Sequence, residues 1–182
     1  KLRIGNGLDE ATDIGPLIDG AALARLRADE RDLAGHARLL FRGTAPEQGA
    51  FMAPVAYQVD WDHLPTTEAF GPLLQVCRWR RPDFPRVLAW LDGNGHGLTL
   101  GLHSRLETLA EQIVRRARIG NIYVNRRMTG AMVGCQPFGG MGLSGTGPKT
   151  GGPHTLLRYT VETVVAVNTA ALGGAIGRRG GE

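Results

Sequence analysis

Apolar residues recur at helical spacing in two stretches of the chain. The first covers about 21–33 and follows Asp19, whose carboxylate can accept a hydrogen bond from the first helical turn. The second begins at Ser104 and Glu107, which have the spacing of a capping box. Its apolar positions are Leu106, Leu109, Ala110, Ile113, Val114 and Ala117. Both stretches predict amphipathic helices with one face toward a core, and a shorter helix is predicted over 82–91.

Short β-branched, aromatic and apolar runs lie between and after these helices. They predict strands over 37–41, 51–59, 73–79, 98–102 and 122–124. Pro54 favours an edge position for the second strand, because proline has no N–H to donate to a ladder. From 73 to 124 the order is strand, helix, strand, helix, strand, which is typical of parallel α/β packing. The predicted fold class is therefore α/β, with a mostly parallel sheet and flanking helices.

Two further patterns occupy the C-terminal end of the chain. Over 160–167, Val161, Thr163, Val165 and Val167 alternate with Glu162, Val164 and Ala166. This alternation predicts a final strand. Residues 169–182 are small and rich in glycine, which predicts a flexible tail.

The composition narrows the class of protein. With 182 residues, of which 42% are hydrophobic and 21% charged, the chain is long enough for one globular domain with a core. Its formal charge of +4 includes two arginine clusters, at 78–81 and 115–118, which are short and flanked by apolar residues. Such clusters favour solvated faces over a nucleic-acid-binding surface. No apolar run is long enough to span a membrane, and we expect no signal peptide.

The cysteines and histidines give no sign of a metal site. The two cysteines, Cys77 and Cys135, lack metal-ligand spacing and imply no disulfide framework. His96, His103 and His154 show no arrangement of metal ligands either. We therefore expect no metal, and a reducing, cytoplasmic location.

Residues 121–153 are the most distinctive part of the sequence. They open as a strand and continue as a long loop crowded with glycine. Its glycines are Gly130, Gly134, Gly139, Gly140, Gly142, Gly145, Gly147, Gly151 and Gly152. Glycine lets a backbone adopt positive φ and approach a ligand closely. The loop also contains apolar residues, which argue against disorder, so its length predicts a functional segment.

This loop resembles the C-terminal part of the aldehyde dehydrogenase superfamily. Four motifs carry the resemblance in order, at 120–126, 129–134, 136–140 and 142–149. Upstream, residues 67–72 are similar to the family's Glu-x-Phe-Gly-Pro motif. Downstream, residues 157–159 and 163–169 resemble the bifunctional proline utilization A proteins in particular. The chain looks most like the L-glutamate-γ-semialdehyde (1-pyrroline-5-carboxylate) dehydrogenase module of those proteins.

The resemblance implies an NAD-dependent oxidation of L-glutamate-γ-semialdehyde to L-glutamate in proline catabolism. A cysteine thiolate attacks the aldehyde, hydride leaves to NAD, and water hydrolyses the thioester with help from a general base. The nucleophile motif and the dinucleotide-binding half should precede Lys1, so the sequence looks like a piece of a longer chain. Cys77 lies inside an apolar strand, and Cys135 lies outside the nucleophile motif. We therefore expect no catalytic residue here and no activity of the isolated chain.

The same resemblance assigns five binding residues. Glu68 would accept hydrogen bonds from the nicotinamide ribose hydroxyls, and Phe70 would pack beside the ribose. Gly130 and Ala131 resemble the anchor loop that binds the substrate's α-carboxylate through backbone N–H groups. Phe138 resembles the aromatic residue that packs on the aliphatic part of the semialdehyde. The plain alternatives are a solvated loop carboxylate, a core phenylalanine and a structural turn.

The resemblance also divides the chain. We expect residues 1–158 to form the distal part of an aldehyde dehydrogenase catalytic domain, residues 159–168 a C-terminal strand that is a candidate oligomerisation element, and residues 169–182 a flexible tail. The full-length parent is expected to be a homo-oligomer. FAD is expected only in an upstream proline dehydrogenase domain.

Two alternatives stay open. The chain could belong to another aldehyde dehydrogenase, stand-alone or of different specificity. It could also be a non-catalytic aldehyde-dehydrogenase-like domain used for assembly or for covering a substrate tunnel. Glu68 and the anchor loop argue against the second alternative, because assembly needs neither. The coding sequence upstream of Lys1 would discriminate among these.

Overall fold

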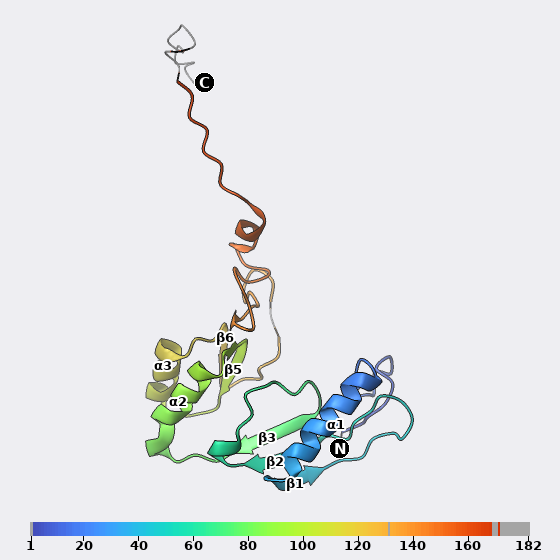
Figure 1. The fold of residues 1–182 in the computed structure, drawn as a ribbon. Helices are drawn as coiled ribbons and strands as arrows, with labels where there is room; N and C mark the ends of the chain where they lie inside the picture. Colours follow the sequence, from blue (N-terminus) through green and yellow to red (C-terminus); the bar gives the residue numbers. More distant parts are fainter. Residues whose placement is uncertain (1, 131, 169–170, 172–182) are drawn as a thin grey trace. The chain divides into compact units, whose positions relative to one another are not determined.

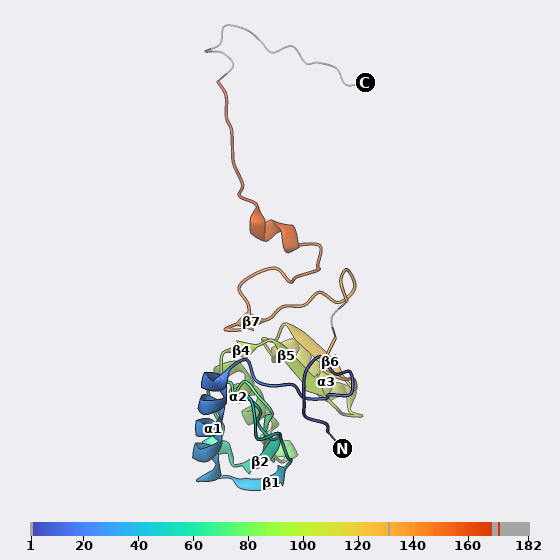
Figure 2. The ribbon, with the colours of Figure 1, turned by 90° about the vertical axis from the view of Figure 1, so that its right-hand side faces the viewer.

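The computed structural model describes residues 2–130, 132–168 and 171 (Figures 1 and 2). The chain divides into two compact units, Lys1–Trp90 and Leu91–Glu182, and the division falls within helix α2 (Phe84–Gly93). In the described part of the chain, no helix has the length and apolar character that crossing a bilayer requires.

The first unit packs one helix on a sheet. Helix α1 (Gly20–Ala34) begins as predicted at Asp19, whose Oδ1 accepts a hydrogen bond from the Ala22 N–H at 2.6 Å. Figure 1 shows α1 lying across the sheet. The core of this unit consists of Leu23, Leu26, Leu33, Met52, Val55, Tyr57 and Val59. Each such side chain contributes about 1.5–3 kcal/mol when fully buried, so this cluster is the main source of stability in the unit.

The sheet has three strands, β1 (Arg38–Arg42), β2 (Val55–Val59) and β3 (Leu73–Cys77), in that order. Strand β2 is central: it pairs antiparallel with β1 and parallel with β3. The edge position predicted for β2 from Pro54 is therefore wrong. Pro54 comes directly before the strand, and its carbonyl accepts a hydrogen bond from the Gly43 N–H at 2.8 Å. The missing proline N–H thus falls outside the ladder and costs no strand pairing.

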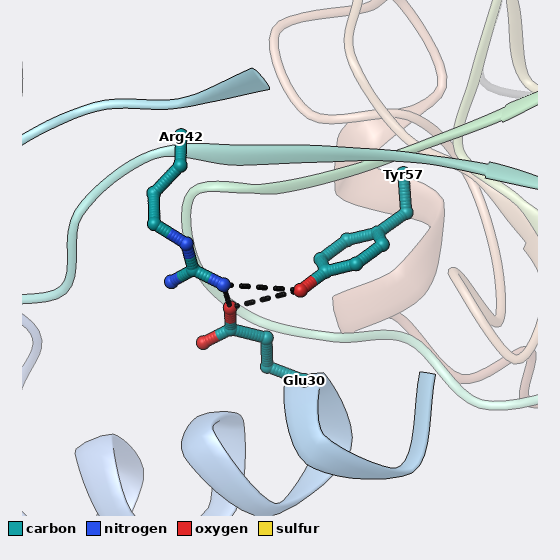
Figure 3. A network of polar contacts seen from close by, with 3 residues as sticks. All are labelled: Glu30, Arg42 and Tyr57. Atoms are coloured by element: carbon teal, nitrogen blue, oxygen red, sulfur yellow. Dashed lines mark hydrogen bonds and ion pairs between the residues drawn. The ribbon is translucent and has the colours of Figure 1, made fainter. Parts of the chain in front are cut away.

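A partly buried polar network joins α1 to two of the strands (Figure 3). Tyr57 on β2 is only 3% exposed, and its hydroxyl donates to Glu30 Oε1 on α1 at 3.2 Å. Arg42 Nη2 on β1 donates to the Tyr57 hydroxyl oxygen at 3.1 Å and also to Glu30 Oε1. Burial, reinforced by the Glu30 carboxylate, raises the pKa of Tyr57, and the hydrogen bond to Glu30 raises the pKa of Arg42. The tyrosine therefore stays a neutral donor and the arginine stays charged.

The second unit contains the predicted strand, helix, strand sequence. Strands β5 (Thr99–Leu102) and β6 (Asn121–Val124) pair in parallel, and helix α3 (Glu107–Arg116) connects them. A second, antiparallel pair joins β4 (His96–Gly97) to β7 (Met141–Gly142), which lies in the glycine-rich loop. Among the described residues, the 3₁₀ turns that span three residues or more are η1 (Trp61–His63), η2 (Arg81–Asp83) and η3 (Thr155–Tyr159).

The capping box predicted for α3 does not form. The helix begins one turn later than Ser104, with Leu106 in the cap position and no side-chain cap. Ser104 is instead bound to Asn125: its N–H donates to Asn125 Oδ1 at 2.9 Å, and its carbonyl accepts from Asn125 Nδ2 at 2.9 Å. Its hydroxyl oxygen accepts from the Leu106 N–H at 3.0 Å. Ser104 therefore shapes the turn before the helix, because its backbone is held by the loop.

The predicted combination of helices and sheets is confirmed, but a mostly parallel sheet is not observed. The described strands form one three-stranded and two two-stranded sheets, with both parallel and antiparallel pairs. Strands β1 and β2 follow each other with no helix between them, so they return on each other as an antiparallel pair. The parallel pairs are β2 with β3, which are connected by a segment containing only the short 3₁₀ turn Trp61–His63, and β5 with β6, which are connected by α3.

Residues 160–167 form no strand within this chain, although their alternation predicts one. Val161, Val164 and Val165 are 91%, 84% and 80% exposed. A strand needs a neighbour for its backbone hydrogen bonds, and no described residue pairs with this segment in a ladder. The oligomerisation strand over 159–168 therefore stays a prediction that requires another chain or segment. The tail expected over 169–182 lies outside the described residues, apart from Ala171.

The polar network predicts a specific loss of stability. Replacing Glu30 by alanine leaves the buried Tyr57 hydroxyl without its acceptor and Arg42 without its counter-ion. We expect Glu30→Ala to lower the free energy of unfolding by about 1–3 kcal/mol, measured by urea denaturation of the purified chain. The neighbouring Asp29 is exposed on the same helix, so Asp29→Ala is the matched control and should change stability by less than about 0.5 kcal/mol. Equal losses in both variants would contradict the role of the network.

Candidate functional site

Glu68 and Phe70 share the wall of one cavity in the first unit. The cavity has a volume of about 810 Å³, and its other walls are helix α1 and residues 16–18. The Phe70 side chain is 78% exposed, so it is not the core phenylalanine that the alternative interpretation requires. Arg25 of α1 lines the same cavity. A carboxylate acceptor, an aromatic face and a cation are groups that a nicotinamide nucleotide can use, and the volume is typical of a ligand site.

Gly71 fixes the turn that presents these two side chains. A Cβ atom at this position would lie 2.1 Å from Leu26 Cδ2, so any larger residue would force this buried core side chain to move. The next residue is tied to the sheet, because the Pro72 carbonyl accepts a hydrogen bond from the Val55 N–H at 2.9 Å. Glu68 and Phe70 therefore extend from a turn with a fixed base.

The predicted anchor turn follows β6 in the second unit. Gly130 has φ of +102°, a conformation that favours glycine strongly. Its carbonyl accepts a hydrogen bond from the Tyr123 hydroxyl at 3.1 Å, and Tyr123 is itself 6% exposed. A buried strand residue therefore orients this peptide. Ala131, the second expected anchor residue, lies outside the described residues.

Phe138 lies further along the same loop on a well-braced backbone. Its N–H and carbonyl exchange hydrogen bonds with Thr150, both at 3.0 Å. The buried Asn121 side chain spans the phenylalanine: its Nδ2 donates to the Pro137 carbonyl at 3.2 Å, and its Oδ1 accepts from the Gly139 N–H at 3.3 Å. The Phe138 ring is 36% exposed, which leaves a face free for an aliphatic ligand.

Three polar side chains of the glycine-rich loop hold it in place. Ser144 Oγ accepts from the Gly97 N–H at 3.2 Å, Thr146 Oγ1 accepts from Arg158 Nη2 at 2.5 Å, and Lys149 Nζ donates to the Gly120 carbonyl. These bonds tie the glycine-rich loop to β4, to β6 and to the segment that follows it. The loop is therefore a braced structure, as its apolar content predicts.

The two thiols have different surroundings. Cys77 is half-buried on β3, and burial, together with the Asp60 carboxylate, raises its thiol pKa against the opposing effect of Arg86. A raised pKa keeps the thiol protonated, whereas a nucleophile needs the thiolate. Cys135 is exposed in the glycine-rich loop. Across the described residues, no three histidine, cysteine, aspartate or glutamate side chains gather in a way that could hold a metal ion.

The structure thus brings Glu68 and Phe70 together, and it places Gly130 and Phe138 on one braced loop of the other unit. Sequence reasoning missed Tyr123 and Asn121, which hold that loop. The available signal was weak: both lie in the strand before the loop, where an aromatic or amide residue is also compatible with ordinary packing.

Comparisons with known proteins agree with the resemblance. The profile described as "Aldehyde dehydrogenase family" matches residues 1–165. "Bifunctional protein PutA" of Escherichia coli K12 is 40% identical over 181 residues, which cover 93% of this chain and 14% of that protein. "1-Pyrroline-5-carboxylate dehydrogenase" of Bacillus subtilis 168 is 35% identical over 161 residues, which cover 87% of this chain and 31% of that enzyme.

Solved structures of proteins with these two names are also similar to this chain. A crystal structure of Bradyrhizobium japonicum proline utilization A is 51% identical and superposes with a TM-score of 0.86, over 95% of this chain and 18% of that one. A 1-pyrroline-5-carboxylate dehydrogenase from Thermus with bound NAD is 34% identical with a TM-score of 0.71, over 83% of this chain and 29% of that one. The chain therefore spans less than a third of the length of these relatives. Because the family profile matches most of its length, the chain belongs to the aldehyde dehydrogenase family.

Proposed function

We propose that this chain is part of an NAD-dependent L-glutamate-γ-semialdehyde dehydrogenase that oxidises the semialdehyde to L-glutamate in proline catabolism. The relatives named PutA and 1-pyrroline-5-carboxylate dehydrogenase support the reaction class. The observation that carries the choice of substrate is the Gly130 turn, with its positive φ and its carbonyl bound by Tyr123. Such a turn can offer backbone N–H groups to a carboxylate.

Glu68 and Phe70 are the proposed cofactor-binding residues. A carboxylate can accept hydrogen bonds from two neighbouring ribose hydroxyls, and an aromatic ring can pack against the sugar. Their shared position on a cavity of about 810 Å³, and the fixed base of their turn at Gly71, support this role. Bound NAD would supply the hydride acceptor. The chain's own contribution is to orient the nicotinamide riboside.

Gly130, Ala131 and Phe138 are the proposed substrate-binding residues. The two small residues would bind the α-carboxylate through their N–H groups, where a larger side chain would block it. The half-exposed ring of Phe138 would pack on the methylene groups between the carboxylate and the aldehyde. Contacts at both ends of the substrate would fix the distance of the aldehyde carbon from the nucleophile, which is the orientation effect that raises rates in enzymes.

The nucleophilic cysteine and the general base are placed in the parent protein outside this chain. The thiolate attacks the aldehyde carbon, the carbon loses hydride, and the resulting thioester is hydrolysed by water to the carboxylate. The parent is proposed to be cytoplasmic and homo-oligomeric, with residues 159–168 as an oligomerisation strand. In a bifunctional parent, FAD would belong to a separate upstream proline dehydrogenase domain.

The isolated 182-residue chain should therefore have no dehydrogenase activity. The measurement is NAD reduction with L-glutamate-γ-semialdehyde by the purified chain, which we expect to equal the blank. A Cys135→Ala variant is the control, because Cys135 is the exposed thiol of the described residues. Turnover above the blank that disappears in this variant would refute the proposal that the nucleophilic cysteine lies outside this chain.

Replacing Glu68 by glutamine in the full-length enzyme should lower dehydrogenase turnover and weaken NAD binding. The amide keeps the shape of the side chain but loses charge and one acceptor, and we expect a loss of about tenfold in kcat/KM for NAD. The matched control is Glu10→Gln, an exposed carboxylate of the same unit. Proline oxidation by an upstream domain should be unchanged. If NAD affinity and rate both stay at the wild-type level, Glu68 is a solvated loop carboxylate.

Replacing Gly130 by valine should remove the preference for substrates with an α-carboxylate. The valine side chain would block the position of the α-carboxylate, so the semialdehyde would lose its hydrogen bonds to the backbone N–H groups of this turn. Loss of one such buried hydrogen bond costs roughly 1–3 kcal/mol, and each 1.4 kcal/mol is about a factor of ten in rate. We therefore expect the ratio of kcat/KM for the semialdehyde to that for propanal to fall at least about tenfold.

Gly134→Val is the matched control for backbone strain. Gly134 also has positive φ, at 82°, but a Cβ there would meet open space. This variant should lower both activities by similar factors and leave the ratio intact. Two results would refute the role of Gly130 in binding the α-carboxylate. One is a wild-type enzyme that prefers propanal, and the other is a folded Gly130→Val variant that loses activity with both aldehydes equally.

A further inference from the structure

The guanidinium of Arg126 lies beside the anchor turn. A Cβ atom built on Gly130 would have Arg126 Nη2 as its nearest neighbour, at 3.7 Å. Among the described residues other than its chain neighbours, no second group lies within 4 Å of that position. Arg126 is the second residue after β6 and is four residues upstream of the glycine, so a single short turn sets their relative positions.

Three contacts hold this guanidinium in place. Its Cζ lies 4.8 Å from the centroid of the Tyr123 ring, which is the geometry of a cation–π contact. Nη1 donates to Gln136 Oε1 at 3.2 Å, and Nη2 donates to the Thr129 carbonyl at 3.5 Å. The Gln136 backbone in turn exchanges hydrogen bonds with Met132 across the loop, at 2.7 and 3.2 Å. The guanidinium thus braces both sides of the turn that contains Gly130.

The positive charge of Arg126 has no acidic partner among the described residues. The ion pairs of the described residues involve Arg42, Arg80, Arg86 and Arg115, and none includes Arg126. Its contacts are an aromatic ring, an amide oxygen and a carbonyl oxygen, which orient the cation without neutralising it. An oriented, unpaired cation next to a turn that offers N–H groups favours an anion at that turn.

Tyr123 couples the cation to the turn. Its ring lies under the guanidinium, and its hydroxyl donates to the Gly130 carbonyl at 3.1 Å. A lysine could keep the charge but could not make the two forked donations while stacking on the ring, because its ammonium is a compact point charge. Arginine therefore suits position 126 better than lysine does.

We propose that Arg126 is a specificity-determining residue that makes this site selective for aldehydes bearing a carboxylate, by holding a positive charge at Gly130. This inference rests on the proposed function, since it names the residue that sets substrate choice at the same turn. Arg126 acts in two ways: it positions the anchor turn through Thr129 and Gln136, and it attracts the carboxylate electrostatically. The electrostatic part is open to solvent, so it is screened by salt.

The test uses the full-length enzyme with Arg126→Met, which removes the charge and keeps an unbranched side chain. The readout is kcat/KM for L-glutamate-γ-semialdehyde and for propanal at low and high ionic strength. We expect the ratio of the two values to fall about five- to tenfold, through a higher KM for the semialdehyde, while propanal turnover stays within about twofold. Added salt should lower the ratio in wild type and leave it unchanged in Arg126→Met. Binding of the product L-glutamate to the enzyme should weaken by a similar factor.

Two conservative variants separate charge from shape. Arg126→Lys should recover part of the ratio at low salt, because it restores the charge, and it serves as the main variant if Arg126→Met does not fold. Tyr123→Phe keeps the ring under the guanidinium and removes only the hydrogen bond to Gly130, so it should reduce activity without altering the salt dependence of the ratio. Equal losses with both aldehydes in Arg126→Met, or an unchanged ratio, would overturn the proposal.

Failure of this inference can be told apart from failure of the proposed function. If wild type prefers the semialdehyde and Gly130→Val abolishes that preference while Arg126→Met retains it, the anchor stands and only the role of Arg126 is wrong. If wild type shows no preference for the semialdehyde, the proposed substrate is wrong, and the role of Arg126 is overturned with it.

Discussion

The second unit depends on a crossing of two backbones at Gly120. A Cβ atom at this position would lie 1.9 Å from the Gly139 carbonyl oxygen, so no other residue fits without moving the loop. The Gly120 N–H donates to the Gly97 carbonyl at 2.8 Å, and its own carbonyl accepts from Lys149. One peptide thus joins β4, the start of β6 and the far end of the glycine-rich loop. Everything that the loop presents to a ligand, including Phe138 one residue before the crossing, is positioned from here.

The two units use different means to hold their candidate binding residues. In the first, a hydrophobic cluster under α1 and the network of Glu30, Arg42 and Tyr57 support the sheet to which the turn before Pro72 is tied. In the second, close backbone packing at glycine and side-chain bonds from Asn121 and Tyr123 replace a large core. A loop braced in this way can keep a polar, open surface near a ligand while its backbone stays fixed, because it does not need to bury apolar side chains.

Local signals predicted the regular elements well. The helix α1 with its Asp19 cap, and the order of β5, α3 and β6, follow from apolar spacing and cap chemistry that act over a few residues. The errors arose where distant partners decide the outcome. Ser104 has the sequence of a cap, but Asn125 binds its backbone from the loop. The alternation over 160–167 describes a strand that pairs with none of the described residues in a ladder.

The sequence supplies candidate site residues, but it does not reveal the contacts that hold them in place. Glu68, Phe70, Gly130 and Phe138 stand in motifs that a family resemblance can identify. The contacts of Arg126 with Tyr123 and Gln136 could not be anticipated, because they depend on how the loop folds back on itself. Position alone does not distinguish an arginine that orients a turn from one on a solvated face.

The most direct test of the account is a crystal structure of the full-length enzyme with L-glutamate bound. We expect the α-carboxylate to lie within hydrogen-bond distance of the Gly130 N–H, with the methylene groups against the ring of Phe138. A carboxylate bound elsewhere, with the turn at Gly130 facing solvent, would contradict the central claim that this loop selects the substrate.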